Sequence, residues 1–184
     1  MTDRRGGAGS TGGVRGDLKQ RVKTARKRTV SQTRWLERQL NDPYVARAKR
    51  EGYRSRAAFK LIEIDERFKL LKPGQRIVDL GAAPGGWSQV AAKVVGPSGR
   101  VVGIDLLPIE PMAGVEFITL DFLDDDAPRQ LTALLGGPAD LVLSDMAANA
   151  TGHKKTDHLR IIGLAETAAE FAREILAQIG RAHV

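Results

Sequence analysis

The chain contains no cysteine, and this absence excludes a disulfide framework and a cysteine-ligated zinc site. It has three histidines, too few for us to expect a metal site. No apolar run approaches the roughly 20 residues that cross a bilayer as a helix. The N-terminus is basic but lacks the apolar core of a secretory signal. We therefore expect a cytoplasmic protein with no bound metal and no membrane partner, and we take it to be a monomer.

Positive charge is plentiful but unevenly distributed. Residues 1–30 hold nine Lys or Arg and two acids, residues 31–60 hold eight and three, and residues 61–184 hold twelve and seventeen. The net charge of +7 therefore arises in the N-terminal third, which favours a polyanionic partner. Because residues 1–30 are rich in Gly, Ser, Thr and Arg, we expect a disordered basic arm there. A tail that only aids solubility is the alternative.

Helical spacing begins after this arm. Residues 31–42 and 42–52 each predict a helix, the second ending at Gly52. Residues 53–71 predict a third helix, closed by Pro73 and Gly74. Its apolar stripe is formed by Ala58, Leu61, Ile62, Asp65, and Phe68 or Leu71.

From Arg76 the chain alternates strands with helices. Predicted strands cover residues 76–81, 99–107, 115–122 and 139–147, and predicted helices cover residues 87–95, 125–137 and 157–178. This alternation is typical of a parallel sheet, so the fold class is α/β: a Rossmann-like, doubly wound sheet with a basic N-terminal helical extension. Ligands of such sheets bind beyond the carboxyl ends of the strands.

A glycine-rich turn, "DLGAAPGGW", follows the first predicted strand and opens a helix. Gly81, Gly85 and Gly86 would let a ligand approach the backbone, and the helix N-terminus offers N–H groups to an anion. The dinucleotide fingerprint G-x-G-x-x-G requires a glycine at position 83, where the chain has Ala83. A nicotinamide cofactor is therefore disfavoured.

Acids follow the next three strands: Asp105, Asp121 and Asp145. Asp105 could accept hydrogen bonds from a ribose diol, and Asp121 could accept one from the amino group of an adenine. Each acid alone is more often a cap or turn residue. Their succession at matching strand ends instead favours a nucleoside cofactor with an amino-acid tail, S-adenosyl-L-methionine.

Five ordered segments, "RSRAAFKL", "DLGAAPGGWSQ", "GIDLLPI", "FITLDF" and "LSDMAANATG", closely resemble the RlmE family, also called FtsJ or RrmJ. Members of that family are methyltransferases of ribosome biogenesis that modify the 2′-O of a uridine in large-subunit (23S) ribosomal RNA. The resemblance runs from Ser31 to Leu176. It implies a Rossmann-like S-adenosylmethionine-dependent enzyme whose partner is the large ribosomal subunit.

The resemblance also implies roles for individual residues. The cofactor contacts carried over are Gly85, Trp87, Asp105, Asp121 and Asp145. Lys60 and Asp145 correspond to two members of a catalytic Lys-Asp-Lys-Glu tetrad. The alternatives are a solvated helix lysine for Lys60 and a core residue for Trp87.

A basic segment lies in the N-terminal part of this resemblance. We expect it to supply phosphate contacts from Tyr44, Arg47, Lys49, Arg50, Tyr53, Arg54 and Arg56.

The second lysine and the glutamate of the tetrad have no counterpart after Gln178, where the chain reads "IGRAHV". These six residues can be encoded by the start of a common sequencing adapter, so we expect residues 179–184 to be a non-native tail. Residues 31–178 would then be an incomplete methyltransferase domain, and we expect this chain to lack activity. A non-catalytic, ribosome-associated RNA-binding module and a nicotinamide oxidoreductase are the competing functions.

Overall fold

The computed structural model describes residues 29–30, 33, 36–37, 41–147 and 151–176. The chain divides into two compact units, residues 1–43 and 44–184. The predicted arm, most of the helix expected over residues 31–42 and the predicted non-native tail lie outside the described residues. Within the described part of the chain, no helix has the length and apolarity needed to cross a membrane.

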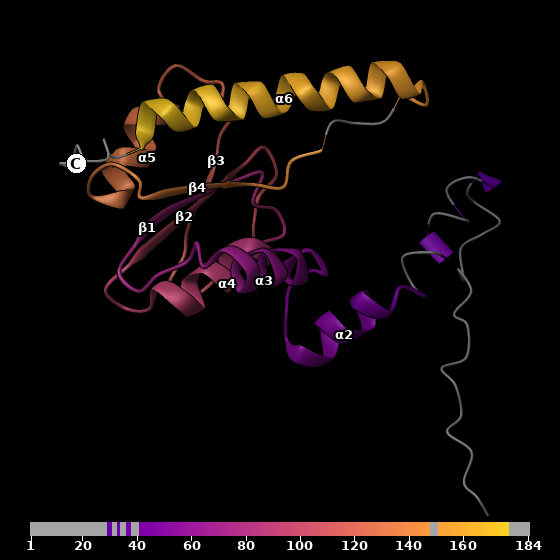
Figure 1. The fold of residues 1–184 in the computed structure, drawn as a ribbon, viewed down its shortest axis with the longest axis horizontal. Helices are drawn as coiled ribbons and strands as arrows, with labels where there is room; N and C mark the ends of the chain where they lie inside the picture. The colour runs from indigo at the N-terminus through magenta and orange to yellow at the C-terminus, as the bar shows by residue number, and fades with distance from the viewer. Residues whose placement is uncertain (1–28, 31–32, 34–35, 38–40, 148–150, 177–184) are drawn as a thin grey trace, which may run out of the picture. The chain divides into compact units, whose positions relative to one another are not determined.

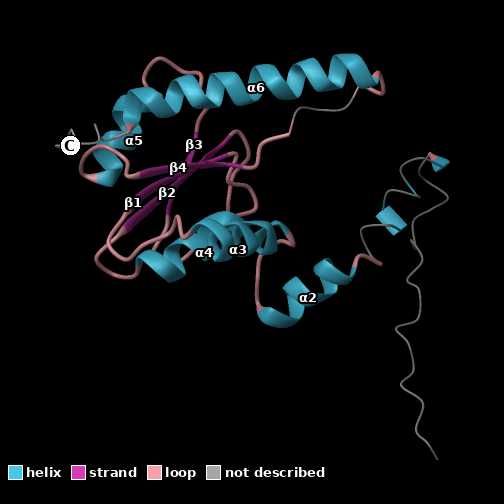
Figure 2. Ribbon diagram, viewed as in Figure 1, coloured by secondary structure: helices cyan, strands magenta, loops and turns pink. Residues whose placement is uncertain are grey.

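Four parallel strands form the sheet, in the order β3-β2-β1-β4 (Figure 2). They are β1 (Arg76–Leu80), β2 (Arg100–Asp105), β3 (Glu116–Thr119) and β4 (Leu141–Ser144). Val78 of β1 lies opposite Val102 of β2 and Val142 of β4, so β1 is central. Strands buried on both faces form nearly continuous apolar runs, as "VVGI" does and as "IVDL" does apart from Asp79. The predicted doubly wound parallel sheet is confirmed.

Helices cover both faces of the sheet (Figure 1). In chain order they are α2 (Pro43–Glu51), α3 (Ala57–Phe68), α4 (Gly86–Val95), α5 (Ala127–Leu135) and α6 (Lys154–Ile175). One core cluster joins α3 and α4 to one face of the sheet, and the other joins α5 and the end of α6 to the opposite face. The helix predicted over residues 42–52 is α2, and Gly52 follows it with a positive φ of 74°.

Helix α3 runs from Ala57 to Phe68 and is shorter than the helix predicted over residues 53–71. Lys69 takes the left-handed conformation and its N–H donates to the carbonyl of Asp65. The Asp65 carboxylate accepts a hydrogen bond from the N–H of Leu71. With this helix end, Leu71 is buried at 6% exposure, whereas Phe68 is 59% exposed. Of the two residues predicted to continue the apolar stripe, Leu71 is therefore the one in the core.

Helix α6 packs only along its C-terminal half. Ala168, Phe171 and Ile175 are buried there, whereas Leu159 and Ile162 in the first half are exposed. Among the residues that the structure describes, the apolar face predicted for the whole helix therefore has a packing partner over only part of its length. Beside it, β4 pairs with β1 on one flank; on the other flank the described residues contribute only an isolated bridge from Ala139 to Leu176.

Candidate active site

A cavity of about 610 Å³ opens at the carboxyl ends of the strands, where the sequence predicts a cofactor site. In the sheet, the chain passes from β3 across β2 and β1 to reach β4. The strand ends at this crossing form the usual binding crevice of such sheets. The lining residues from the strand ends include Gly81, Ala83, Asp105, Asp121 and Asp145. Three of the five predicted cofactor residues, Asp105, Asp121 and Asp145, thus share one cavity.

Asp105 and Asp121 also serve as turn residues. The Asp105 carboxylate accepts hydrogen bonds from the N–H of Ala83 at 3.0 Å and from the N–H of Leu107 at 2.9 Å. Asp121 accepts one from the N–H of Leu123 at 3.0 Å. Each carboxylate oxygen has two lone pairs, so these bonds leave acceptor capacity for a ligand. The turn role and the ligand role are therefore compatible.

The N-terminus of α4 is partly occupied by the protein's own carboxylate. Asp79, at the end of β1, is 2% exposed and accepts hydrogen bonds from the hydroxyl and the backbone N–H of Ser88. Burial raises the pKa of Asp79 to about 7, although both Ser88 bonds act in the opposite direction. The sequence predicts that the N–H groups at this helix end are free for a ligand. For Ser88 that prediction is wrong, because its N–H donates to Asp79.

The glycines of the turn make room for the protein's own side chains. A Cβ at Gly81 would lie 2.3 Å from Met146 Cγ, and a Cβ at Gly86 would lie 2.2 Å from Ser55 Oγ. Gly85 has a φ of 99°, and the Arg54 side chain covers it. Close packing thus explains the missing side chains at Gly81 and Gly86. Gly81 also lines the strand-end cavity, and the expectation that these glycines bring a ligand to the backbone stays a prediction.

Trp87 lies in the core beneath α3. It is 9% exposed, and its indole N–H donates to the carbonyl of Ala57 at 2.8 Å. Neither Trp87 nor Gly85 is among the residues that line the strand-end cavity. Their carried-over role as cofactor contacts stays a prediction.

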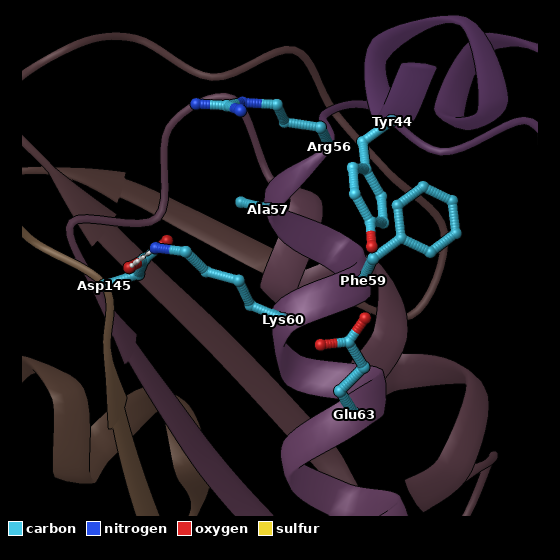
Figure 3. Close-up of a pocket in the computed structure, with 7 residues that line it drawn as sticks. All are labelled: Tyr44, Arg56, Ala57, Phe59, Lys60, Glu63 and Asp145. Carbon is cyan, nitrogen blue, oxygen red and sulfur yellow. Dashed lines mark hydrogen bonds and ion pairs between the residues drawn. The ribbon is translucent and has the colours of Figure 1, made fainter. Parts of the chain in front are cut away.

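A second cavity, of about 370 Å³, shares Asp145 with the first, and Figure 3 shows the residues that line it. Its walls come from α2, α3 and the residue after β4: Tyr44, Arg56, Ala57, Phe59, Lys60, Glu63 and Asp145. Lys60 extends from α3 toward Asp145, and its Nζ lies 2.7 Å from Asp145 Oδ1. The two side chains are 63% and 32% exposed, so water reaches the pair.

Asp145 lines both cavities. A molecule in the first cavity and a molecule in the second would therefore meet at one carboxylate, with a lysine ammonium alongside it. This arrangement suits the transfer of a group between two substrates, since both reactants are held at the groups that orient them.

Sequence reasoning did not identify Glu63 and Met146 as site residues. Glu63 follows Lys60 by three positions, the spacing at which helix residues share a face, and this spacing could have pointed to it. Met146 lines the first cavity and fills the space above Gly81, which nothing in the local sequence indicates. Among the residues described, no cluster of three or more His, Cys, Asp or Glu could hold a metal ion.

The fold is that of a Rossmann-like α/β domain with a ligand-sized cavity and three acids at the carboxyl ends of its strands. Residues 53–183 match the model of the FtsJ-like methyltransferase family, and the chain belongs to that family. This assignment leaves the nicotinamide oxidoreductase without support.

Similar proteins include two named ribosomal RNA large subunit methyltransferase E. The relative from Xanthobacter autotrophicus is 70% identical over 89% of this chain and 65% of its own length. The relative from Sphingopyxis alaskensis is 66% identical over 90% of this chain and 72% of its own length. The chain thus spans about two thirds of these relatives. A crystal structure of a ribosomal RNA methyltransferase from Plasmodium falciparum matches with a TM-score of 0.62 and 32% identity, covering 68% of this chain and 73% of that one.

Proposed function

We propose that this chain carries the cofactor site and part of the catalytic centre of an S-adenosylmethionine-dependent methyltransferase of ribosome biogenesis. Its acceptor is the 2′-hydroxyl of a uridine in large-subunit ribosomal RNA. The names of the relatives support the RNA substrate. The observation that carries the proposal is the meeting of two cavities at Asp145, beside Lys60.

The first cavity suits S-adenosylmethionine in size and lining. Its volume falls within the roughly 300–1,000 Å³ typical of ligand sites. Ile104, Leu120 and Phe122 offer an apolar surface to an adenine, and Asp105 offers a carboxylate to a ribose diol. When bound, the cofactor would supply an electrophilic methyl group on a sulfonium.

The second cavity would receive the acceptor nucleoside. Tyr44 and Arg56 give it an aromatic ring and a guanidinium, groups that contact bases and phosphates of unpaired RNA. The Lys60 ammonium and the Asp145 carboxylate would donate to and accept from the ribose hydroxyl, aligning its oxygen for attack. Taking up the hydroxyl proton requires a base with a free lone pair, and a lysine can act as one only when it is neutral. The family pattern assigns a second lysine that has no counterpart here, so we predict that this chain alone lacks turnover.

A chimera tests the reaction itself. Residues 1–178 would be joined to the C-terminal segment of the Xanthobacter autotrophicus relative that lies beyond the match, and incubated with methyl-labelled S-adenosylmethionine and large ribosomal subunits. We expect label on the 2′-O of a uridine, and none when Lys60 is replaced by Met. A chimera that binds the cofactor and the particle yet transfers no label would contradict the proposal.

The unaltered 184-residue chain provides the second arm of this experiment. It should bind S-adenosylmethionine without transferring label. Turnover by this chain would contradict the predicted inactivity. Salt-sensitive binding to the particle without any cofactor binding would favour the RNA-binding module. Within the proposal, residues 1–30 act as a basic arm of a cytoplasmic monomer, residues 31–178 form the domain, and residues 179–184 take no part.

A further inference from the structure

Arg54 lies in the segment between α2 and α3, and its guanidinium contacts two separate loops. It donates to the carbonyls of Glu110 and Pro111 at 2.6 Å each, and to the carbonyl of Pro84 at 3.4 Å. Pro84 belongs to the glycine-rich turn after β1, and Glu110 and Pro111 belong to the loop after β2. One side chain therefore joins the two loops to each other and to the segment before α3.

Packing fixes the guanidinium in this position. Its central carbon lies 5.9 Å from the centre of the Phe117 ring, within the range of a cation–π contact. Arg54 also covers Gly85, where an added Cβ would lie 3.3 Å from its Cδ and Nη1. The missing side chain at Gly85 thus gives the arginine its path to the loop after β2.

The Arg54 backbone is held as well. Gln89 of α4 accepts a hydrogen bond from the Arg54 N–H at 2.9 Å and donates one to the carbonyl of Gly52 at 2.8 Å. Because both polar atoms of one amide are used, the segment is anchored to α4 independently of the guanidinium. Replacing the Arg54 side chain should therefore release the loops without detaching the segment.

Both joined loops contribute to the strand-end cavity. Ala83 from the first loop and Leu106 and Leu107 from the second line it. Two other hydrogen bonds of the second loop are local, from Leu107 N–H to Asp105 and from Val115 N–H to the carbonyl of Met112. Arg54 instead supplies an anchor from outside the loop.

We propose that Arg54 is a positioning residue for the cofactor cavity: its guanidinium fixes the separation of the loops after β1 and β2. This inference rests on the proposed function, because the cavity it shapes is the proposed cofactor site. This role competes with the expectation that Arg54 is a phosphate contact, since its guanidinium already donates to three backbone carbonyls. An ammonium cannot replace it, because a guanidinium presents five N–H groups in a planar fork and a lysine presents three from one point.

The test compares Arg54→Lys and Arg54→Ala with the unaltered chain, using calorimetric titration with S-adenosylmethionine. Arg67→Ala is the matched control, because it removes an equal charge from an exposed arginine of α3 outside both cavities. We expect both Arg54 variants to raise the Kd for S-adenosylmethionine by about tenfold, because they lose hydrogen bonds from a charged group. Arg67→Ala should leave this Kd within about twofold of that of the unaltered chain.

The lysine variant separates positioning from RNA contact. If Arg54 positions the loops, Arg54→Lys weakens cofactor binding and keeps the salt-sensitive affinity for large subunits. If Arg54 is a phosphate contact, Arg54→Lys keeps the cofactor Kd and the inference is overturned. Absence of cofactor binding by the unaltered chain would overturn the proposed function and this inference together, whereas unchanged binding by both variants overturns this inference alone.

Amide hydrogen exchange in the absence of cofactor provides a second readout. We expect faster exchange over residues 106–115 in both variants, with unchanged exchange in β1 and α4. Unchanged exchange over residues 106–115 would contradict the proposed anchoring. Arg54→Lys keeps the charge and most of the aliphatic stem, so it supplies both readouts if Arg54→Ala fails to fold.

Discussion

The two sides of the central strand differ in how completely they are packed. On one side, β2 is covered on both faces and paired on both flanks. On the other, β4 is paired to β1, and the first half of α6 exposes Leu159 and Ile162. The strand-end cavity draws mostly on the first side, and Asp145 lies on the second. The cavity therefore lies mainly on the well-packed side, while the Lys60–Asp145 pair lies at its margin.

Substitution of a β2 glycine should give the largest effect. A Cβ at Gly103 would lie 2.6 Å from the Phe117 ring and 2.8 Å from Ala82 Cβ, so Gly103→Val should lower the free energy of unfolding by more than about 3 kcal/mol. Chemical denaturation measures it. Gly163→Ala in α6 is the control, because nothing lies within 4 Å of its Cβ; it should stabilise by roughly 0.5–1 kcal/mol. Equal changes in the free energy of unfolding for the two variants would contradict the difference in packing between β2 and the first half of α6.

The two halves of α6 can be compared directly. Phe171 is 8% exposed and packs edge-on against Phe122, so Phe171→Ala should cost about 3 kcal/mol. Leu159 is 68% exposed, so Leu159→Ala should change the free energy of unfolding by less than about 0.5 kcal/mol. Thermal and urea unfolding of both variants provide the comparison. A large loss at Leu159 would mean that the first half of α6 has a packing partner.

Asp79 predicts a pH dependence for the well-packed side. Its pKa is raised by burial from 3.8 to about 7, so the folded state favours the protonated carboxyl, with Asp145 and Asp105 adding repulsion. This contribution is fully present below about pH 4 and is lost as the pH rises toward 7 and above. We expect Asp79→Asn to remove a decline of about 3–4 kcal/mol in that window. Parallel pH profiles for the variant and the unaltered chain would contradict the assignment.

Lys60 should have the smallest effect on stability. Its ion pair with Asp145 is 63% exposed on the lysine side, and such pairs contribute about 0–1 kcal/mol. The Tm of Lys60→Met should therefore lie within a few degrees of the Tm of the unaltered chain, because a change of about 1 kcal/mol shifts Tm by only a few degrees. The same change in the chimera should abolish methyl transfer. A chimera with Lys60→Met that still transfers label would separate this pair from the chemistry.

The sheet and the helices could be predicted from local sequence, because strand periodicity and turn residues act over short distances. The strands at "RIVDLG" and "GRVVGIDLL" became β1 and β2 with ends shifted by one or two residues. The end of α3 was less predictable, since the Asp65 carboxylate selects Leu71 over Phe68 by a side-chain bond. The unpacked half of α6 was not foreseen either, because its apolar spacing is the same whether or not a partner covers it.

The candidate site was predictable as a set of strand-end acids, but the reasons for several residues depend on long-range packing. Gly86 accommodates Ser55, and Gly81 accommodates Met146 from beyond β4. Asp79 of β1 accepts a hydrogen bond from the Ser88 hydroxyl of α4. In the sequence, Arg54 is one of many basic residues. Only the structure shows that its guanidinium donates hydrogen bonds to two loops. Such contacts join residues 9 to 65 positions apart, so sequence spacing does not reveal them.

The most direct test is a calorimetric titration of S-adenosylmethionine into the chain and into Asp121→Ala, with Asp125→Ala as the control. Asp121 lines the cavity and Asp125 does not. The account predicts one bound cofactor per chain, binding weakened about tenfold by loss of the Asp121 acceptor, and no change in the control. No binding, or equal binding by the unaltered chain and both variants, would contradict the assignment of this cavity.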